Sequence, residues 1–257
     1  RYCEARVWSY FNMFTARGNE FLPYILGDTD TPMPLFVKPD RKISVQDVKN
    51  AMRDHYEGTP LDISKDFGAG PYHTPYRLSP LSFKVGDKEY FNERPISTQQ
   101  SGFVFVAQMR STLPDAIGGV LWFGTDDANM TVFTPVYCCT DKVPVCYSRV
   151  DGADYITFSW NSSFWIFNWV SNMVYPRYDL MIGDVRATQN ELETTFNEAQ
   201  EGIESAAAKL LEKDPAKAKA FLTNYTNMTA QSAFDTWKRL GEFIIVKYND
   251  GVVRKMK

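Results

Sequence analysis

Three apolar segments joined by short connections fall between residues 101 and 139, and they constrain the fold more than any other feature. The segments are 101–110, 118–125 and 131–139, and Asp126-Asp127-Ala128-Asn129 between the last two has the composition of a turn. Consecutive strands with short turns favour an antiparallel meander. Because Phe103-Val104-Phe105-Val106-Ala107 is apolar at every position, we expect this strand to be buried on both faces.

The segment before the meander predicts two helices and a hairpin. Apolar residues recur at helical spacing from Tyr2 to Thr15, and Ser44 with Asp47 has the pattern that begins a helix. Gly86-Asp87 separates the strand-like segments Leu81–Val85 and Glu89–Phe91, which is typical of a hairpin.

The segment after the meander predicts one more strand and then helices. We expect a strand over Asp154–Trp160 and a helix over Asn161–Tyr175, with Asn161 at the N-cap. Gln189–Leu211 is rich in good helix formers, and Asp214-Pro215 has the pattern of a second helix start. A last helix is expected to end near Gly241, because glycine is common at helix ends, and Phe243–Val246 is expected to form a terminal strand.

Composition argues against several functions. The net charge is −3 with no basic block, which argues against nucleic-acid binding, and no apolar run is long enough to span a membrane. There are only two histidines and no Cys-x-x-Cys pair, so a zinc site is not expected. The cysteines are interpreted as small buried thiols, with a disulfide from Cys146 to Cys138 or Cys139 as the alternative in an oxidising compartment.

No familiar catalytic triad can be assembled from these residues. Neither His55 nor His73 lies beside a nucleophile-elbow motif, and Asp126-Asp127 is interpreted as part of a turn. Asn161 opens an aromatic segment, and a neutral amide can donate a hydrogen bond to a developing oxyanion. The alternative is that this amide only caps the helix or satisfies backbone groups.

The beginning of the chain predicts a longer protein. Arg1-Tyr2-Cys3-Glu4-Ala5-Arg6-Val7-Trp8 has neither a start methionine nor the apolar core of a signal peptide. It has the pattern of a helix interior, so we expect the chain to be part of a longer protein or a processed subunit.

Several long strings resemble the C69 dipeptidases, a family of N-terminal-nucleophile hydrolases. They occur in the family's order, and the resemblance extends from Tyr2 to about Phe196. The strings begin at Lys38 (KPDRKISVQDV), Met52 (MRDHYEGTP), Gly68 (GAGPY), Arg94 (RPISTQQSGF), Trp122 (WFGTDD) and Trp160 (WNSSFW).

This resemblance implies an α+β fold, as part of a four-layer αββα sandwich with antiparallel sheets, and the helical pattern toward the end of the chain adds a helical C-terminal extension. Residues 1–184 would form the second part of the hydrolase domain, and residues 185–257 the extension with its terminal strand. The upstream half of the same protein would complete the sandwich. Apolar surface left uncovered without that half is expected to favour a homo-oligomer.

The resemblance also implies a dipeptide substrate and a cysteine nucleophile at the first position of the mature enzyme, with its own α-amine as base. Arg1 cannot serve, and Cys3 lies inside a predicted helix, so we expect no nucleophile in this chain and an attacking cysteine upstream. No metal or other cofactor is implied.

Related penicillin V acylases and bile-salt hydrolases carry an oxyanion-hole asparagine in a segment similar to the one that Asn161 opens. Arg177 or Arg186 would then match the arginine that follows it. An amidase of that kind, or a catalytically silent binding domain, is the alternative function.

Overall fold

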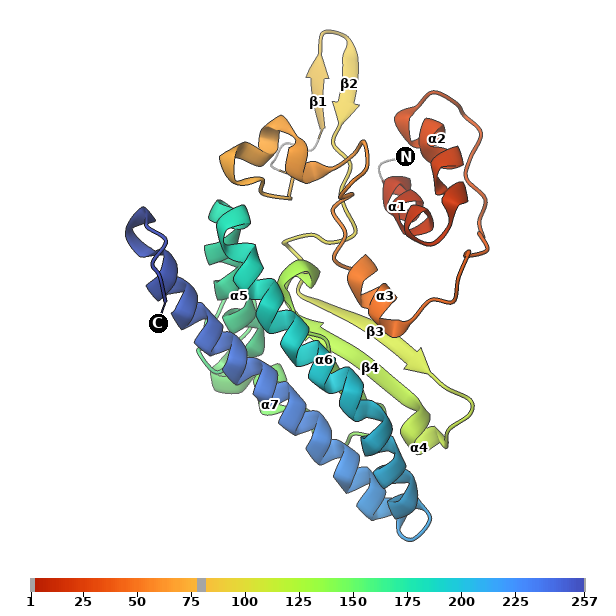
Figure 1. Cartoon of the computed structure of the whole chain (residues 1–257), viewed down its shortest axis with the longest axis vertical. Helices are drawn as coiled ribbons and strands as arrows, with labels where there is room; N and C mark the ends of the chain where they lie inside the picture. Colours follow the sequence, from red (N-terminus) through yellow and green to blue (C-terminus); the bar gives the residue numbers. More distant parts are fainter. Residues whose placement is uncertain (1–2, 78–81, 257) are drawn as a thin grey trace. The chain divides into compact units, whose positions relative to one another are not determined.

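The computed structural model describes residues 3–77 and 82–256. The chain forms two compact units, an N-terminal unit of residues 1–99 and a C-terminal unit of residues 100–257. Each unit has its own elements, coloured along the chain in Figure 1.

The N-terminal unit consists of short elements around a small aromatic core. Its elements are α1 (Glu4–Phe14), α2 (Leu22–Leu26), α3 (Val45–Ala51), β1 (Ser82–Val85) and β2 (Lys88–Phe91), with short 3₁₀ turns at Ala16–Phe21, Ile63–Lys65 and Phe67–Tyr72. Trp8 of α1 is fully buried against Tyr56, and its indole N–H donates to the Gly18 carbonyl at 3.0 Å.

Local signals in this unit predict α1, α3 and the hairpin correctly, but not α2. Ser44 caps α3 in a full capping box, since its hydroxyl accepts from the Asp47 amide while the Asp47 carboxylate accepts from the Ser44 amide. Strands β1 and β2 pair as the expected antiparallel hairpin. Leu81, where the first of these strands was expected to begin, lies outside the described residues.

The C-terminal unit contains the predicted meander. Strands β3 (Phe103–Met109), β4 (Gly119–Thr125) and β5 (Thr134–Tyr137) pair antiparallel in that order, and the short α4 (Asp115–Gly118) lies in the first connection. The helices that follow are α5 (Ser163–Val174), α6 (Tyr178–Leu211) and α7 (Pro215–Tyr248). Figure 1 shows α6 and α7 as a long antiparallel hairpin.

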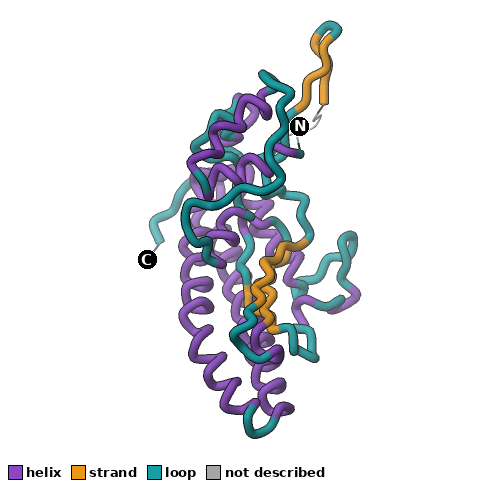
Figure 2. Tube along the Cα trace, turned by 90° about the vertical axis from the view of Figure 1, so that its right-hand side faces the viewer, coloured by secondary structure: helices purple, strands orange, loops and turns teal. Residues whose placement is uncertain are grey.

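One face of β3 is buried and the other is exposed. Val104, Val106 and Trp122 face inward, whereas Phe103, Phe105 and Met109 are 61%, 49% and 67% exposed. The expectation of a strand buried on both faces is therefore wrong for β3. Its composition is apolar throughout, but α6 and α7 pack on one side of the sheet, as Figure 2 shows, and the side chains on the opposite side of β3 stay about half exposed or more.

Polar contacts join the buried sheet face to the helical hairpin. Glu204 of α6 pairs with Arg110 at 2.6 Å and accepts from the Tyr137 hydroxyl at 3.1 Å. Glu204 is almost fully buried, and a buried carboxylate costs free energy unless it is paired in this way. These contacts therefore fix the position of α6 along the sheet.

The expected strand over Asp154–Trp160 is wrong. This segment forms an irregular loop with a single isolated bridge between Asp154 and Thr157. The bridge and the Asp154 side chain close a tight local turn, because the carboxylate accepts from the Ile156 amide at 3.1 Å. Backbone groups satisfied within a turn are not available to a neighbouring strand.

The C-terminal helix is also longer than expected. One continuous helix begins after Asp214, which caps it as predicted, and extends through Gly241 to Tyr248. The expected helix end at Gly241 and the terminal strand over Phe243–Val246 are therefore wrong. Gly241 is buried in the helix interior because the indole ring of Trp169 packs against it, and a Cβ there would lie 2.2 Å from that ring.

The fold is α+β with small antiparallel sheets and a helical C-terminal portion, as expected. The domain boundary near residue 184 stays a prediction. Among residues 3–77 and 82–256, no helix is both long and apolar enough to cross a membrane.

Gly241→Ala is expected to destabilise the protein although alanine is the better helix former. An ordinary glycine-to-alanine change inside a helix stabilises by roughly 0.5–1 kcal/mol. Here the added methyl group collides with the Trp169 indole, so the melting temperature should fall. Gly202→Ala in α6 is the matched control, since its Cβ meets nothing within 4 Å, and it should raise the melting temperature. Equal shifts in the two variants would contradict this packing.

Candidate active site

Three consecutive residues at the end of β4 contact α5 along its length. The hydroxyls of Thr125 and Ser163 share a hydrogen bond of 2.9 Å. Asp126 accepts from the Asn168 amide at 2.8 Å and from the Ser171 hydroxyl at 2.9 Å. The next carboxylate, Asp127, accepts from the Tyr175 hydroxyl just beyond the helix.

Asp126 is a strained and deeply buried carboxyl. Its φ of 67° lies in the left-handed region, and its residue is only 2% exposed. Burial raises its pKa to about 7, opposed by the hydrogen bond from Asn168. It can exchange a proton at neutral pH, but it is closed off from solvent, so its role in this structure is to hold α5.

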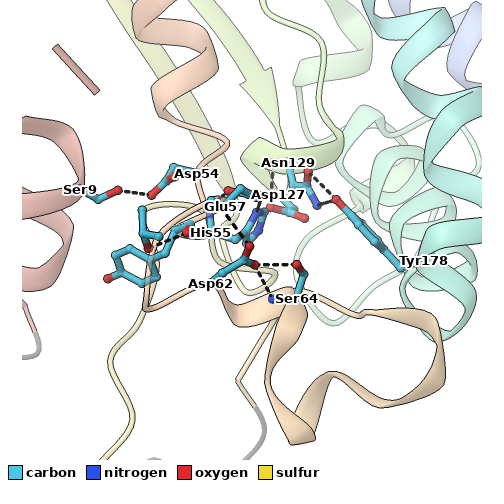
Figure 3. Close-up of polar contacts among 12 residues, drawn as sticks. Ser9, Asp54, His55, Glu57, Asp62, Ser64, Asp127, Asn129 and Tyr178 are labelled. Carbon is cyan, nitrogen blue, oxygen red and sulfur yellow. Dashed lines mark hydrogen bonds and ion pairs between the residues drawn. The ribbon is translucent and has the colours of Figure 1, made fainter. Parts of the chain in front are cut away.

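Asn129 links the same turn to α6. Its side chain donates to the Tyr178 hydroxyl at 3.2 Å, and Figure 3 shows this contact beside Asp127. Arg186 donates to both oxygens of Asn129, and Gln189 donates to its backbone carbonyl at 3.1 Å. The residues expected to form a simple turn therefore form a fully buried polar cluster.

Asn161 lies in the loop before α5 and is exposed. Its side-chain amide donates to Asp151 at 2.8 Å, and the Ser159 hydroxyl donates to the same carboxylate oxygen at 2.8 Å. The prediction that Asn161 is the N-cap is wrong, because the N-cap of α5 is Ser162. Asn161 also does not follow a strand, since the segment before it is a loop.

Asn161 keeps the capacity to donate a second hydrogen bond. A side-chain amide carries two N–H groups, and one of them goes to Asp151. The hydrogen bonds from Asn161 and Ser159 also lower the pKa of Asp151, so this carboxylate stays ionised at neutral pH. The Asp151 contact therefore fixes the orientation of the amide.

The two arginines considered with Asn161 have other partners, and so do the amides of Asn168 and Asn172 on α5. Arg177 donates to the Tyr248 carbonyl at 2.8 Å, and Arg186 donates to the Asn129 side-chain oxygen. Asn168 donates to the Asp126 carboxylate, and Asn172 donates to the Asn168 carbonyl at 2.8 Å.

A pocket of about 350 Å³ lies beside this loop, at the end of the sheet. Ser162, the residue after Asn161, lines it, and Arg149 and Asp154 form an ion pair of 3.3 Å in its wall. Its volume falls within the range of small-molecule sites. The remaining wall is mainly aromatic, from Phe103, Phe123, Tyr147, Tyr155 and Phe164.

The cysteines do not resemble activated nucleophiles. All four are free, and Cys3 and Cys138 are exposed, contrary to the interpretation as buried thiols. Burial raises the pKa of the Cys146 thiol to about 12 and also raises that of Cys139. A raised pKa keeps a thiol protonated and unreactive. Among the residues that the structure describes, no group of three or more His, Cys, Asp or Glu side chains could hold a metal ion.

The N-terminal unit contains a second buried polar cluster (Figure 3). His55 is 1% exposed and its Nδ1 lies 3.1 Å from Glu57, while Nε2 has no hydrogen-bond partner in the described part of the chain. Asp54 accepts from the Ser9 hydroxyl at 2.6 Å, and burial raises its pKa to about 6. Tyr56, between His55 and Glu57 in sequence, has a φ of 64°, which is rare for a bulky residue.

Sequence reasoning missed both buried clusters. Asp126 and Asp127 were interpreted as turn residues, and His55 was considered only for a catalytic triad. The sequence did contain a signal for the cluster around Asp126 and Asp127. Two adjacent acidic residues directly after an apolar strand require nearby hydrogen-bond donors if they become buried.

The family model and the similar proteins agree on one family. A model of Peptidase family C69 matches residues 1–191. A probable dipeptidase B of Lactococcus lactis is 27% identical over 247 residues, which cover 92% of this chain and 45% of the relative. A probable dipeptidase of Salmonella dublin is 32% identical over 132 residues, 51% of this chain and 25% of the relative. The chain thus spans less than half the length of these relatives.

Asp126→Asn is expected to change how stability depends on pH. The folded pKa of about 7 exceeds the value of about 4 for an unfolded chain. The stability that this carboxyl contributes is therefore fully present below about pH 4 and is lost as the pH rises through 7. Asparagine does not ionise, so the melting temperature of the variant should fall less between about pH 5 and pH 8.

Glu201→Gln is the matched control for this measurement, because Glu201 is an exposed carboxylate on α6. It should leave the pH profile of the melting temperature unchanged. An Asp126→Asn profile that runs parallel to the wild-type profile would show that Asp126 ionises normally.

Proposed function

The chain belongs to peptidase family C69, and from that membership we propose that the full-length protein hydrolyses dipeptides. The observation that carries the proposal is the match over residues 1–191, together with relatives that are named dipeptidases. The pocket beside Asn161 supports it, since it has the size of a small-molecule site and both apolar and charged walls.

We place the attacking cysteine outside this chain. The resemblance to N-terminal-nucleophile hydrolases implies a terminal cysteine whose own α-amine removes the thiol proton. Within the chain, Cys139 and Cys146 have raised pKa values, and Cys3 adjoins the first residue of α1. The C-terminal unit would then contribute one wall of the cleft.

In this mechanism the thiolate attacks the carbonyl carbon of the peptide bond, and negative charge develops on the carbonyl oxygen. Asn161 would donate its second amide N–H to that oxygen. The leaving amine takes the proton that the α-amine removed, and water then hydrolyses the thioester to release the acid. The partial positive charge at the start of α5, two residues after Asn161, favours the same negative charge.

Hydrolysis assays on two forms of the protein test the proposal. The full-length protein is expected to release free amino acids from dipeptides, whereas the 257-residue chain alone should not, because it lacks an activated thiolate. Cys3→Ala should change neither result. Turnover by the 257-residue chain that disappears in Cys3→Ala would place the nucleophile inside it. Cleavage of acyl amides but not dipeptides would favour an amidase, and no hydrolysis of either would favour a binding domain.

Asn161→Ala in the full-length protein is expected to lower kcat about a hundredfold with little change in KM, as loss of an oxyanion donor does. Asp151→Ala is the matched control, because it removes the tether of the amide but not its N–H groups. Its kcat should stay within about tenfold of wild type, since an oriented donor loses only part of its effect when it becomes mobile.

The competing account gives Asn161 only a structural role in holding the loop. In that case the two variants would lose similar melting temperature and keep similar kcat. That result would remove Asn161 from the mechanism.

A further inference from the structure

A pocket of about 520 Å³ in the N-terminal unit is lined by the first turn of α1 and by the open end of the β1–β2 hairpin. Its polar and charged lining consists of Arg6, Ser82, Asn92, Arg94 and Thr98. No acidic residue of the described part of the chain lines it, and arginine is always protonated, so the lining carries two positive charges. We propose that this pocket binds the phosphoryl group of a small phosphate monoester, whether or not the full-length protein hydrolyses dipeptides.

The two arginines of this pocket have no acidic partner. Neither the Arg6 nor the Arg94 guanidinium forms an ion pair or a hydrogen bond with residues 3–77 or 82–256. Arg17 of the same unit, by contrast, pairs with Glu20 at 3.3 Å. A guanidinium group carries five N–H donors, so the donors of both pocket arginines remain for a ligand or for water.

The acidic residues closest to these arginines in sequence have partners of their own. Glu4, in the first turn of α1, accepts from the Tyr24 hydroxyl at 2.8 Å. Glu93, in the segment after β2, pairs with Arg77. Neither carboxylate lines the pocket, so the chain's own acidic residues do not neutralise the positive charge there.

One buried tyrosine brings the two arginines to the same place. Tyr56 is fully buried and stacks on Trp8 of α1, and its hydroxyl donates to the Arg94 carbonyl at 2.6 Å. Burial raises the pKa of this hydroxyl, and the positive charge of Arg6 opposes that rise because it lies nearby. The Tyr56 hydroxyl is therefore close to both arginines, and the core of the unit fixes their positions in the chain relative to each other.

The charge of the lining favours a phosphoryl group over a carboxylate. A phosphate monoester carries about two negative charges at pH 7 and presents three strong acceptor oxygens. A carboxylate carries one charge and two oxygens. Two guanidinium groups match the dianion, and the Ser82 hydroxyl and the Asn92 amide supply neutral donors in the same lining.

The size of the pocket favours an organic phosphate over free phosphate. Its volume lies within the range of small-molecule sites and exceeds the space that one phosphoryl group fills. Phe91, the last residue of β2, lines the pocket and is 47% exposed. Aromatic rings pack well against other aromatic or apolar groups, so this ring suits the organic part of the ester.

Calorimetry on the full-length protein with phenyl phosphate, inorganic phosphate and benzoate tests the assignment. Phenyl phosphate is expected to bind more tightly than either of the others. Arg6→Gln and Arg94→Gln should each weaken its binding at least about tenfold, because each removes charge-assisted hydrogen bonds to the phosphoryl oxygens. Arg17→Gln is the matched control, since it removes a charge of the same unit outside the pocket, and it should leave the affinity unchanged.

Phe91→Ala tests the organic part of the ligand separately. It should lower the affinity for phenyl phosphate toward that for inorganic phosphate and leave the latter unchanged. Phe83→Ala is the control, because Phe83 stacks on Tyr90 in the same hairpin but does not line the pocket. Equal affinities of the wild-type protein for phenyl phosphate and inorganic phosphate would limit the site to free phosphate and contradict the assignment of an ester.

Alkylation of Cys3 locates the ligand without any substitution. Cys3 is exposed and lines the pocket, whereas Cys138 is exposed and lies outside it. Bound phenyl phosphate should slow the reaction of Cys3 with iodoacetamide and leave that of Cys138 unchanged.

The proposal fails if phenyl phosphate does not bind, if benzoate binds as tightly, or if Cys3 reacts equally fast with and without phenyl phosphate. It also fails if Arg6→Gln and Arg94→Gln lower the melting temperature but leave the affinity for phenyl phosphate unchanged. The arginines would then pair with acidic residues in another part of the full-length protein.

Discussion

The C-terminal unit depends on the burial of two adjacent carboxyl groups directly after β4. A buried carboxylate is costly unless donors surround it, and α5 and its C-terminal end supply the side-chain donors described for Asp126 and Asp127. If α5 shifted along the sheet, these groups would lose partners without gaining water. The pair therefore sets the position of the helix, and apolar contacts such as Phe167 on Trp237 then stabilise it.

The position of α5 in turn determines the geometry of the candidate active site. The loop before it is attached through Trp165 and through Asn161, and the pocket lies between that loop and the end of the sheet. A polar cluster outside the pocket thus positions the loop that borders the pocket. This division is common in enzymes, where groups outside the reacting site fix the ones inside it.

The elements with short-range signals could be predicted from the sequence. Ser44 and Asp214 cap helices through partners two or three residues away, so their patterns are visible locally. The helix end predicted at Gly241 was wrong because the residue that packs there, Trp169, is distant in sequence. The burial of Asp126 was not predicted because its donor Asn168 lies 42 residues later. Asn161 was proposed from its family-like segment, but its partner Asp151 and the pocket depend on loop geometry that no periodicity encodes.

Hydrogen exchange on Tyr175→Phe tests most directly whether the carboxyl cluster holds α5. The variant removes one donor to Asp127 and no apolar surface. Tyr225→Phe is the matched control, because the buried Tyr225 hydroxyl has no hydrogen-bond partner among the described residues. The account predicts that Tyr175→Phe alone speeds exchange in α5 and in residues 151–161 together, while β3 and β4 stay protected. Equal protection of α5 in the two variants would contradict it.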